Sequence, residues 1–526
     1  LGHGNTNSSY DSSDFGDGLP YSELGTGLTA TDLYVGSKHT CALLSDNSVK
    51  CWGFNYNGQL GLGHTNHIGD EPGEMGDNLT ALNLNGSAIK LADNGDGRSD
   101  TTCAIMSTNE MKCWGDNNEY NILQRNDLGI GDESGEMGVN TPTFNIGSSL
   151  NIRSIDQRCA LDSNGDVYCW GDTSDAFLGD GVSYLNYDFG DNFSQVGNYP
   201  KVLLPSGKKA LQISVTHYTT CALLDDFTVR CWGYNNYGQA GIGLPDRAVG
   251  DSLSELGDNM QAVDFGTGKY PIALTAQNGF CNSSCSYGTS YCALLNTQEV
   301  KCWGSNDYGV LGIESSIAEL GQDSAELGDN WPSVKFGSTG FTTGGPKVKK
   351  VVGGVRMFCA LFENQKIKCW GGPTHGQLGY EDSITRGIAT DSMEDDLPFV
   401  NLGTGVLVKD IYRSHKTNIC VKTTTNSIKC WGFDGNGDLL SNGTSWSRGG
   451  SVGDMGDNLP DSYLGPDPVM QMFTGEVTCP LYTNGRIRCF GYNDYGRLGQ
   501  ETTATLDGTQ NNIDNNLPYI KLESGH

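Results

Sequence analysis

The stretch Cys41-Ala-Leu-Leu-Ser-Asp-Asn-Ser-Val-Lys-Cys51-Trp52-Gly53 decides the fold. It contains an apolar run, a polar turn and a second short apolar run, a pattern typical of a β-hairpin. A three-residue turn at residues 45–47 places Cys41 directly opposite Cys51. Opposed residues on antiparallel strands have Cβ atoms about 4.5–5.5 Å apart, which a small backbone adjustment brings within disulfide range. The stretch therefore predicts a hairpin closed by a disulfide.

The same spacing recurs along the whole chain. Cysteines ten positions apart account for sixteen of the eighteen cysteines, and Gly occurs two positions after the second cysteine in every pair. Trp lies between them in seven pairs, and Phe490 replaces it in the eighth. The pairs are Cys41 and Cys51, Cys103 and Cys113, Cys159 and Cys169, Cys221 and Cys231, Cys292 and Cys302, Cys359 and Cys369, Cys420 and Cys430, and Cys479 and Cys489. Repetition at intervals of 56 to 71 residues indicates a solenoid or a propeller.

Each repeat also carries two further strand-like segments. In the first repeat these are a Leu-Pro segment at residues 19–24 and an apolar run at 31–36. Helical periodicity is absent beyond a turn or two, and short apolar runs between Gly, Asn and Asp dominate. The sequence predicts an all-β fold, a β-propeller of eight four-stranded repeats. A seven-bladed ring with an extra repeat and an open spiral are the alternatives.

The predicted domain organisation is simple. Residues 1–18 are polar and form an N-terminal arm, and residues 19–526 form one propeller domain. Leu-Pro segments number nine and hairpins number eight, so a C-terminal strand at 517–522 is surplus. We expect it either to close the ring against the first blade or to pair with a neighbouring molecule, because an unpaired edge is a template for strand addition.

Cysteine usage indicates the compartment. Eight pairs at hairpin spacing favour disulfides and hence an oxidising environment. Two cysteines remain, Cys281 and Cys285, for which we expect a local bridge. Reduced thiols in the core are one alternative. Zinc is another, because Cys281, Cys285, Cys292 and Cys302 could supply four thiolates, although without the usual paired-knuckle spacing.

The charge of the chain restricts its partners. Lys and Arg total 33 against 62 Asp and Glu, a formal net charge of −29. Such a surface repels nucleic acid and anionic lipid, and no apolar run is long enough to span a membrane. Acidic linkers recur between the repeats, and the clearest contains Asp70, Glu71, Glu74 and Asp77. These four carboxylates are a candidate Ca²⁺ site, and the alternative is a solvated acidic loop.

Six Asn-x-Ser/Thr sites lie in polar, turn-like stretches. Together with the cysteines they predict N-linked glycans on a secreted protein. The acceptor residues are Asn7, Asn78, Asn85, Asn192, Asn282 and Asn442.

With these elements assembled, the chain resembles the regulator-of-chromosome-condensation repeat family of β-propellers. The resemblance covers about residues 19–522 and rests on an aromatic-Gly and Gly-x-Leu-Gly pattern. That pattern occurs in whole or in most part in tails at 52–61, 232–241, 303–312, 370–379 and 490–499. Family rings usually have seven blades, intracellular members lack the cysteine pairs, and the acidic linkers here are unusually long. The resemblance implies a protein-binding propeller, in an extracellular, disulfide-stapled form.

The function that we predict is structural. We expect a secreted, non-enzymatic scaffold in an extracellular or cell-surface assembly, with other proteins or copies of itself as partners and a head-to-tail filament as one form. A soluble protein-binding module, such as an inhibitor or receptor ectodomain, is the alternative, and a carbohydrate-active enzyme is the third. The motifs HExxH and GxxxxGK[ST] are absent, and no catalytic residue and no cofactor is predicted.

Overall fold

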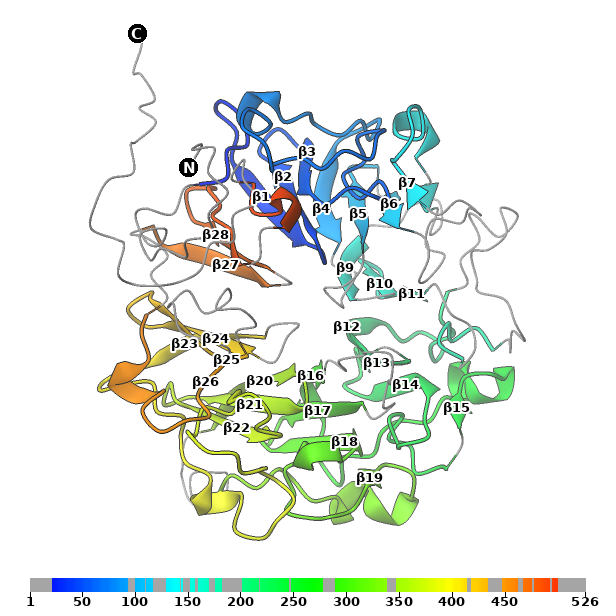
Figure 1. Cartoon of the computed structure of the whole chain (residues 1–526). Helices are drawn as coiled ribbons and strands as arrows, with labels where there is room; N and C mark the ends of the chain where they lie inside the picture. The colour runs from blue at the N-terminus through cyan, green and yellow to red at the C-terminus, as the bar shows by residue number, and fades with distance from the viewer. Residues whose placement is uncertain are drawn as a thin grey trace.

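Eight antiparallel sheets surround a common centre (Figure 1). The structure is a computed structural model, and the all-β, eight-repeat prediction is confirmed. The structure describes residues 21–92, 100–108, 110–116, 129–141, 143–144, 152–156, 159–169, 176–181, 201–216, 218–245, 247–277, 289–337, 347–413, 418–433, 447–461, 467–474, 477–491 and 494–499.

Each sheet is one blade, numbered in chain order. Blade 1 contains β1 (Ala30–Val35), β2 (His39–Leu44) and β3 (Val49–Gly53), and blade 2 contains β4 (Ala88–Ala92), β5 (Thr101–Met106), β6 (Met111–Asp116), β7 (Gly129–Ile130) and β8 (Thr143–Phe144). Blade 3 contains β9 (Ile152–Asp156), β10 (Cys159–Asp162) and β11 (Val167–Cys169), and blade 4 contains β12 (Ala210–Val215), β13 (Thr219–Leu224), β14 (Val229–Tyr234) and β15 (Ala248–Val249). Blade 5 contains β16 (Pro271–Ala276), β17 (Ser290–Leu295), β18 (Val300–Ser305) and β19 (Glu319–Leu320), and blade 6 contains β20 (Val348–Gly354), β21 (Met357–Phe362) and β22 (Ile367–Gly371). Blade 7 contains β23 (Val408–Arg413), β24 (Asn418–Thr423), β25 (Ile428–Phe433) and β26 (Ser447–Arg448), and blade 8 contains β27 (Val469–Thr474), β28 (Val477–Tyr482) and β29 (Phe490–Gly491).

Helical structure in the described ranges is limited to single 3₁₀ turns. These are η3 (Gly76–Asn78), η4 (Gly138–Asn140), η6 (Leu253–Glu255), η7 (Gly257–Asn259), η8 (Asp307–Gly309), η9 (Ser324–Glu326), η10 (Gly328–Asn330), η12 (Glu394–Asp396), η13 (Gly456–Asn458) and η14 (Asp494–Gly496). Across the described part of the chain, none of the helical segments has the length and apolar character needed to cross a bilayer.

The first strand of each blade faces the centre of the ring (Figure 1). Side chains on one inner strand bond to the backbone of the next, because neighbouring inner strands lie close together. Asp32 on β1 accepts from the amide of Leu91 on β4 at 3.0 Å. Gln212 on β12 both donates to and accepts from Leu274 on β16, at 2.7 and 3.1 Å. The inner strands thus hold the blades in register around the centre.

The second and third strands form the hairpin that the cysteine spacing predicts. In the ladder of β2 and β3, Cys41 lies directly opposite Cys51. All eight predicted hairpin pairs are joined as disulfides, with Cα atoms 4.0 to 4.3 Å apart. The bridges join Cys41 to Cys51, Cys103 to Cys113, Cys159 to Cys169, Cys221 to Cys231, Cys292 to Cys302, Cys359 to Cys369, Cys420 to Cys430, and Cys479 to Cys489.

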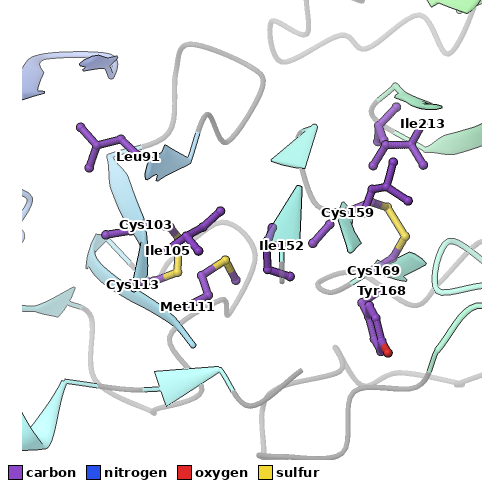
Figure 2. Close-up of a cluster of buried hydrophobic side chains, with 14 of the residues drawn as sticks. Leu91, Cys103, Ile105, Met111, Cys113, Ile152, Cys159, Tyr168, Cys169 and Ile213 are labelled. Carbon is purple, nitrogen blue, oxygen red and sulfur yellow. A yellow bond between two sulfur atoms is a disulfide. The ribbon is translucent and has the colours of Figure 1, made fainter. Parts of the chain in front are cut away.

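The disulfides lie inside the blades. Figure 2 shows the bridged cysteines of blades 2 and 3, Cys113 and Cys169 among them, surrounded by buried apolar side chains. Because Cys292 and Cys302 are joined to each other, the alternative of a four-thiolate zinc site fails. The remaining predicted bridge, between Cys281 and Cys285, lies outside the described residues.

In six blades of the described chain, the tryptophan after the second cysteine joins the blade to the one before it. Trp52, Trp114, Trp232, Trp303, Trp370 and Trp431 are completely buried. The indole N–H of Trp370 donates to the carbonyl of Val310 in the tail of blade 5, at 2.8 Å. Blades 2, 4, 5 and 7 repeat this bond at 2.8 to 3.0 Å. One side chain therefore fills the space between blades and fixes their separation.

Leu-Pro segments do not belong to the repeats that they precede in the sequence. The amide of Leu82 donates to the carbonyl of Val49, which places residues 79–84 on the outer edge of blade 1. Val263 bonds to Val229 in the same way on blade 4. Our expectation that residues 19–24 open the first blade is therefore wrong. Each segment completes the preceding hairpin and then leads into the inner strand of the next blade.

The ring closes between blades 8 and 1. The amide of Ser22 donates to the carbonyl of Ile487, so the first described residues form the outer edge of blade 8. Trp52 donates to the carbonyl of Arg497 at 3.0 Å, the same bond that joins the other blades. The structure is thus a closed ring of eight blades and neither a spiral nor a seven-bladed ring. Residues 1–18 and 517–522 lie outside the described residues.

A buried histidine makes the contact between blades 1 and 2 sensitive to acid: His39 Nε2 on β2 lies 2.6 Å from Thr102 Oγ1 on β5. Burial, and secondarily the charge of Arg497, lowers the pKa of His39 to about 3. An unfolded chain binds this proton near pH 6.5, so the free energy of unfolding falls as the pH drops from about 6.5 towards 3.

We expect this single group to contribute a slope of about 1.4 kcal/mol per pH unit in that window. His39→Gln should remove that slope, measured by urea unfolding between pH 7 and 5. An unchanged slope in the variant would contradict the assignment. His64→Gln provides a control, because His64 lies in the linker of blade 1, away from this position.

Candidate protein-binding surface

The acidic linkers form one structural unit, repeated around the ring. They span residues 68–78, 130–140, 249–259, 320–330, 386–396 and 448–458, and we call them the collar. Each begins beside the glycine of Cys-Trp-Gly: β7, β15, β19 and β26 pair there, and Gly53 and Gly371 form single bridges. The collar is therefore an extension of the sheets.

In five of the six collar loops a carboxylate accepts backbone amides of the turn, and in the loop 386–396 the hydroxyl of Ser392 accepts from the amide of Gly387. Glu74 Oε2 accepts from the amides of Gly69, Asp70 and Glu71 at 2.8, 3.2 and 3.0 Å. Glu136, Glu255, Glu326 and Asp454 have the same role in other blades. The repeated acidic residue is thus a structural acceptor, because turn amides need a partner.

A second carboxylate fixes the collar to the turn after the Leu-Pro segment. Asp329 accepts from the amide and the hydroxyl of Thr267 at 2.9 and 2.7 Å. Asp77, Asp258 and Asp457 bind Thr26, Ser206 and Thr404 in the same two ways. Since these bonds favour the ionised form, they hold the pKa of all four carboxyls below the usual value.

Two of the four carboxylates proposed as Ca²⁺ ligands are hydrogen-bond acceptors within the structure. Glu74 and Asp77 accept hydrogen bonds from different parts of the chain. In the described ranges, no three His, Cys, Asp or Glu side chains are grouped to hold a metal ion. Calcium binding at Asp70, Glu71, Glu74 and Asp77 remains only a prediction from the sequence.

Close packing between neighbours explains the first glycine of the Gly-x-Leu-Gly tail. A Cβ on Gly58 would lie 2.5 Å from the amide nitrogen of Asp132 in the next collar loop. Gly238 and Gly309 would meet the carbonyls of Leu320 and Arg386, each at 2.7 Å. Any side chain there would separate the tail from the collar.

Sequence reasoning missed a buried or half-buried cation in seven of the eight blades. Lys or Arg precedes the second cysteine in seven of the eight repeats, and Tyr168 replaces it in the third. Lys301 Nζ donates to the carbonyls of Phe265 and Gly328 at 2.9 and 2.8 Å, joining a Leu-Pro segment to the collar. Burial lowers the pKa of Lys301 and Lys368 to about 8. The repeated basic position in an acidic chain was the available signal.

The outer surface of the collar is free to contact other molecules. Val452, Val139 and Leu253 lie on the collar and are 91%, 76% and 64% exposed, and Tyr56 in the tail of blade 1 is 70% exposed. These are the four most exposed large apolar side chains among the described residues. Exposed large apolar side chains on an ordered loop are candidates for contact with a partner protein.

The ring, its buried tryptophans and its glycine tails define a β-propeller protein. The protein-family model described as "Regulator of chromosome condensation (RCC1) repeat" matches residues 30–59 and 211–239, which lie in blades 1 and 4. The chain is an RCC1-repeat β-propeller, and an RCC1-like propeller indicates a protein-interaction module.

Two curated relatives carry similar sequences. The ultraviolet-B receptor UVR8 of Arabidopsis thaliana is 26% identical over 326 residues, which cover 60% of this chain and 61% of the receptor. The E3 ubiquitin-protein ligase HERC2 of Homo sapiens is 26% identical over 368 residues, 68% of this chain and 6% of the ligase. The chain thus spans less than two thirds of the length of either relative.

Among solved structures, Prp20p from Saccharomyces cerevisiae aligns with 91% of this chain and 86% of its own, at 13% identity and a TM-score of 0.43. That structure was described together with the binding of Prp20p to Gsp1p and histones.

The two hydrogen bonds that Asp329 accepts from Thr267 can be tested by hydrogen exchange. Asp329→Ala should raise the exchange rate of the Thr267 amide several-fold, because its acceptor is removed. Asp329→Asn is the matched variant: it keeps one oxygen acceptor and should raise the rate less. Equal rates in wild type and Asp329→Ala would contradict the role. As the pKa of Asp329 is lowered, wild-type protection should persist in mild acid and decline only as the pH falls through that lowered value.

Proposed function

We propose that this chain is a secreted, non-enzymatic scaffold that binds other proteins within an extracellular or cell-surface assembly. Copies of the chain itself are among the proposed partners, and a head-to-tail filament is one form that such an assembly takes when the contact does not close. The single observation that carries the proposal is the disulfide in each of the eight blades.

The disulfides support an oxidising compartment. Each closes a short hairpin, which stabilises a fold by about 2–3 kcal/mol in the chain-entropy model. Reducing compartments keep cysteines as free thiols. A chain with the same disulfide in every repeat therefore fits secretion far better than the cytosol. The relatives of this chain do not decide the compartment, and the crosslinks are the support for it.

The collar supports protein binding. Its exposed apolar residues, Val139, Leu253 and Val452, belong to three separate blades, so a partner can contact the ring from several directions. A net charge of −29 disfavours nucleic acid and anionic lipid and favours partners with a basic surface. Binding of Gsp1p and histones by Prp20p is a precedent in a similar fold.

N-linked glycans are part of the proposal. Asn78 and Asn85 lie in the described residues, and both are exposed. Asn78 Nδ2 also donates to the carbonyl of Gly73 at 2.8 Å, and Asn140 makes the equivalent bond in blade 2. Asn78 therefore has a structural role that Asn85 lacks, and Asn85 is the acceptor that we expect to be modified more fully. Asn7, Asn192, Asn282 and Asn442 lie outside the described residues.

Light scattering on the secreted full chain tests the scaffold function. We expect the weight-average mass to rise above that of the 56.4 kDa chain as concentration increases roughly a hundredfold, because self-contact follows mass action. Leu253→Asp combined with Val452→Asp should reduce that rise. Leu211→Asp is the control, since it makes the same change on inner strand β12. A monomer at every concentration would contradict self-assembly, and retention of the disulfide-bonded chain inside cells would contradict secretion.

A further inference from the structure

The outer edge of blade 8 differs from the other outer edges in how the chain reaches it. In blades 1, 4, 5 and 6 the Leu-Pro segment begins 18 or 19 residues after the last glycine of the tail of the same blade. In blade 8 the edge is occupied by residues 21–24, from the other end of the chain. Residue 517 begins a Leu-Pro segment 18 residues after Gly499, the spacing at which the other blades complete themselves.

The contacts at this edge define what it accepts. Ser22 donates from its amide to Ile487 at 3.2 Å and from its hydroxyl to the carbonyl of Leu498 at 2.9 Å. The hydroxyl of Tyr21 donates to Asp467 at 2.5 Å, and the Tyr21 ring lies 4.1 Å from the guanidinium of Arg488. The edge thus recognises a backbone amide and a tyrosine one position before it.

The C-terminal segment carries the same recognition features. Leu517, Pro518, Tyr519 and Leu522 repeat the residues at 19, 20, 21 and 24. Between them, Ile520 corresponds to Ser22. That position is apolar in six other blades, at Leu82, Phe144, Val202, Val263, Val334 and Val400, and is Ser462 in blade 7. Five of these six side chains are buried: Leu82, Val202, Val263, Val334 and Val400 are 8%, 0%, 4%, 2% and 6% exposed.

We propose that the outer edge of blade 8 is a docking site for two segments of this chain, and that residues 517–522 bind there in exchange with residues 21–24. Ile520 would place an aliphatic side chain where Ser22 now lies, as in most other blades. Tyr519 would meet the same Asp467 and Arg488 as Tyr21. Leu522 would present its carbonyl to Lys50, whose Nζ now donates to Leu24 at 2.9 Å.

Replacement of residues 21–24 by residues 517–522 leaves the rest of the ring intact. Inner strand β1 keeps its own bond to blade 8, from the amide of Ala30 to the carbonyl of Gly485 at 2.6 Å. Only the segment before Ala30 is displaced. A chain closed by its C-terminal segment presents residues 21–24 to other copies and supplies the self-contact that the scaffold needs. That last consequence rests on the proposed function, whereas docking of 517–522 depends on neither secretion nor assembly.

Hydrogen exchange on the oxidised full chain tests the docking. Ile520→Asp should increase the exchange rate of residues 519–522 on the order of tenfold, the factor expected when one buried aliphatic side chain is lost, and should slow exchange at residue 22. Ser22→Val should do the reverse. Lys521→Gln is the matched control: it changes the charge by the same amount at a position that corresponds to the exposed Glu23, and it should leave both segments unchanged.

The outcomes separate the proposal from its alternatives. Exchange at 519–522 equal to that of an unstructured peptide in the wild type, with residue 22 indifferent to Ile520→Asp, would overturn it. A dimer whose formation depends on Ile520 would place the segment on a second copy and overturn docking within one chain. Near-ultraviolet circular dichroism checks that each variant retains the ring. A chain that stays monomeric but shows the reciprocal exchange supports docking while contradicting self-assembly.

Discussion

Everything in this ring depends on the register of one antiparallel hairpin. With Cys359 directly opposite Cys369, the following Trp370 must point to the face that meets the preceding blade, because successive side chains on a strand alternate between faces. A slip of one residue would separate the cysteines and turn the tryptophan away. The disulfide therefore stabilises the fold in two ways: it restricts the unfolded chain, and it excludes the register in which the blades cannot join.

Each contact between two blades contains hydrogen-bonded polar groups that are surrounded by apolar side chains. An indole N–H reaches a carbonyl of the preceding tail, a lysine reaches two more carbonyls, and the surrounding apolar side chains exclude water from both. Buried polar groups stabilise a structure only when they are paired, and here the repeat pairs them in the same way around the ring. The seam between blades 8 and 1 uses the same bonds, which is why eight copies close without a special joint.

The sequence was sufficient for the repeat, the hairpin, the disulfide pairs and the eight blades, because these follow from a cysteine spacing of ten residues that recurs every 56 to 71 residues. It was not sufficient for the assignment of the Leu-Pro segments. A segment between two hairpins has the same apolar pattern whichever hairpin it joins, and only the bond from Leu82 to Val49 settles the choice. The structure of the acidic linkers could not be predicted either. Asp77 and its partner Thr26 are distant in sequence, and a carboxylate whose hydrogen-bond partner is unknown is expected to be solvated. The collar therefore changes from a solubility feature into an ordered surface suited to binding proteins.

The oxidised state of the hairpins is the claim on which the compartment and the proposed scaffold both rest. It is tested most directly by alkylating the native, unreduced protein under denaturing conditions and measuring its mass. The account predicts that none of the sixteen cysteines in the eight hairpin pairs is alkylated. Alkylation of all sixteen would show that the thiols are reduced, and would contradict both the crosslinked ring and the assignment to the outside of the cell.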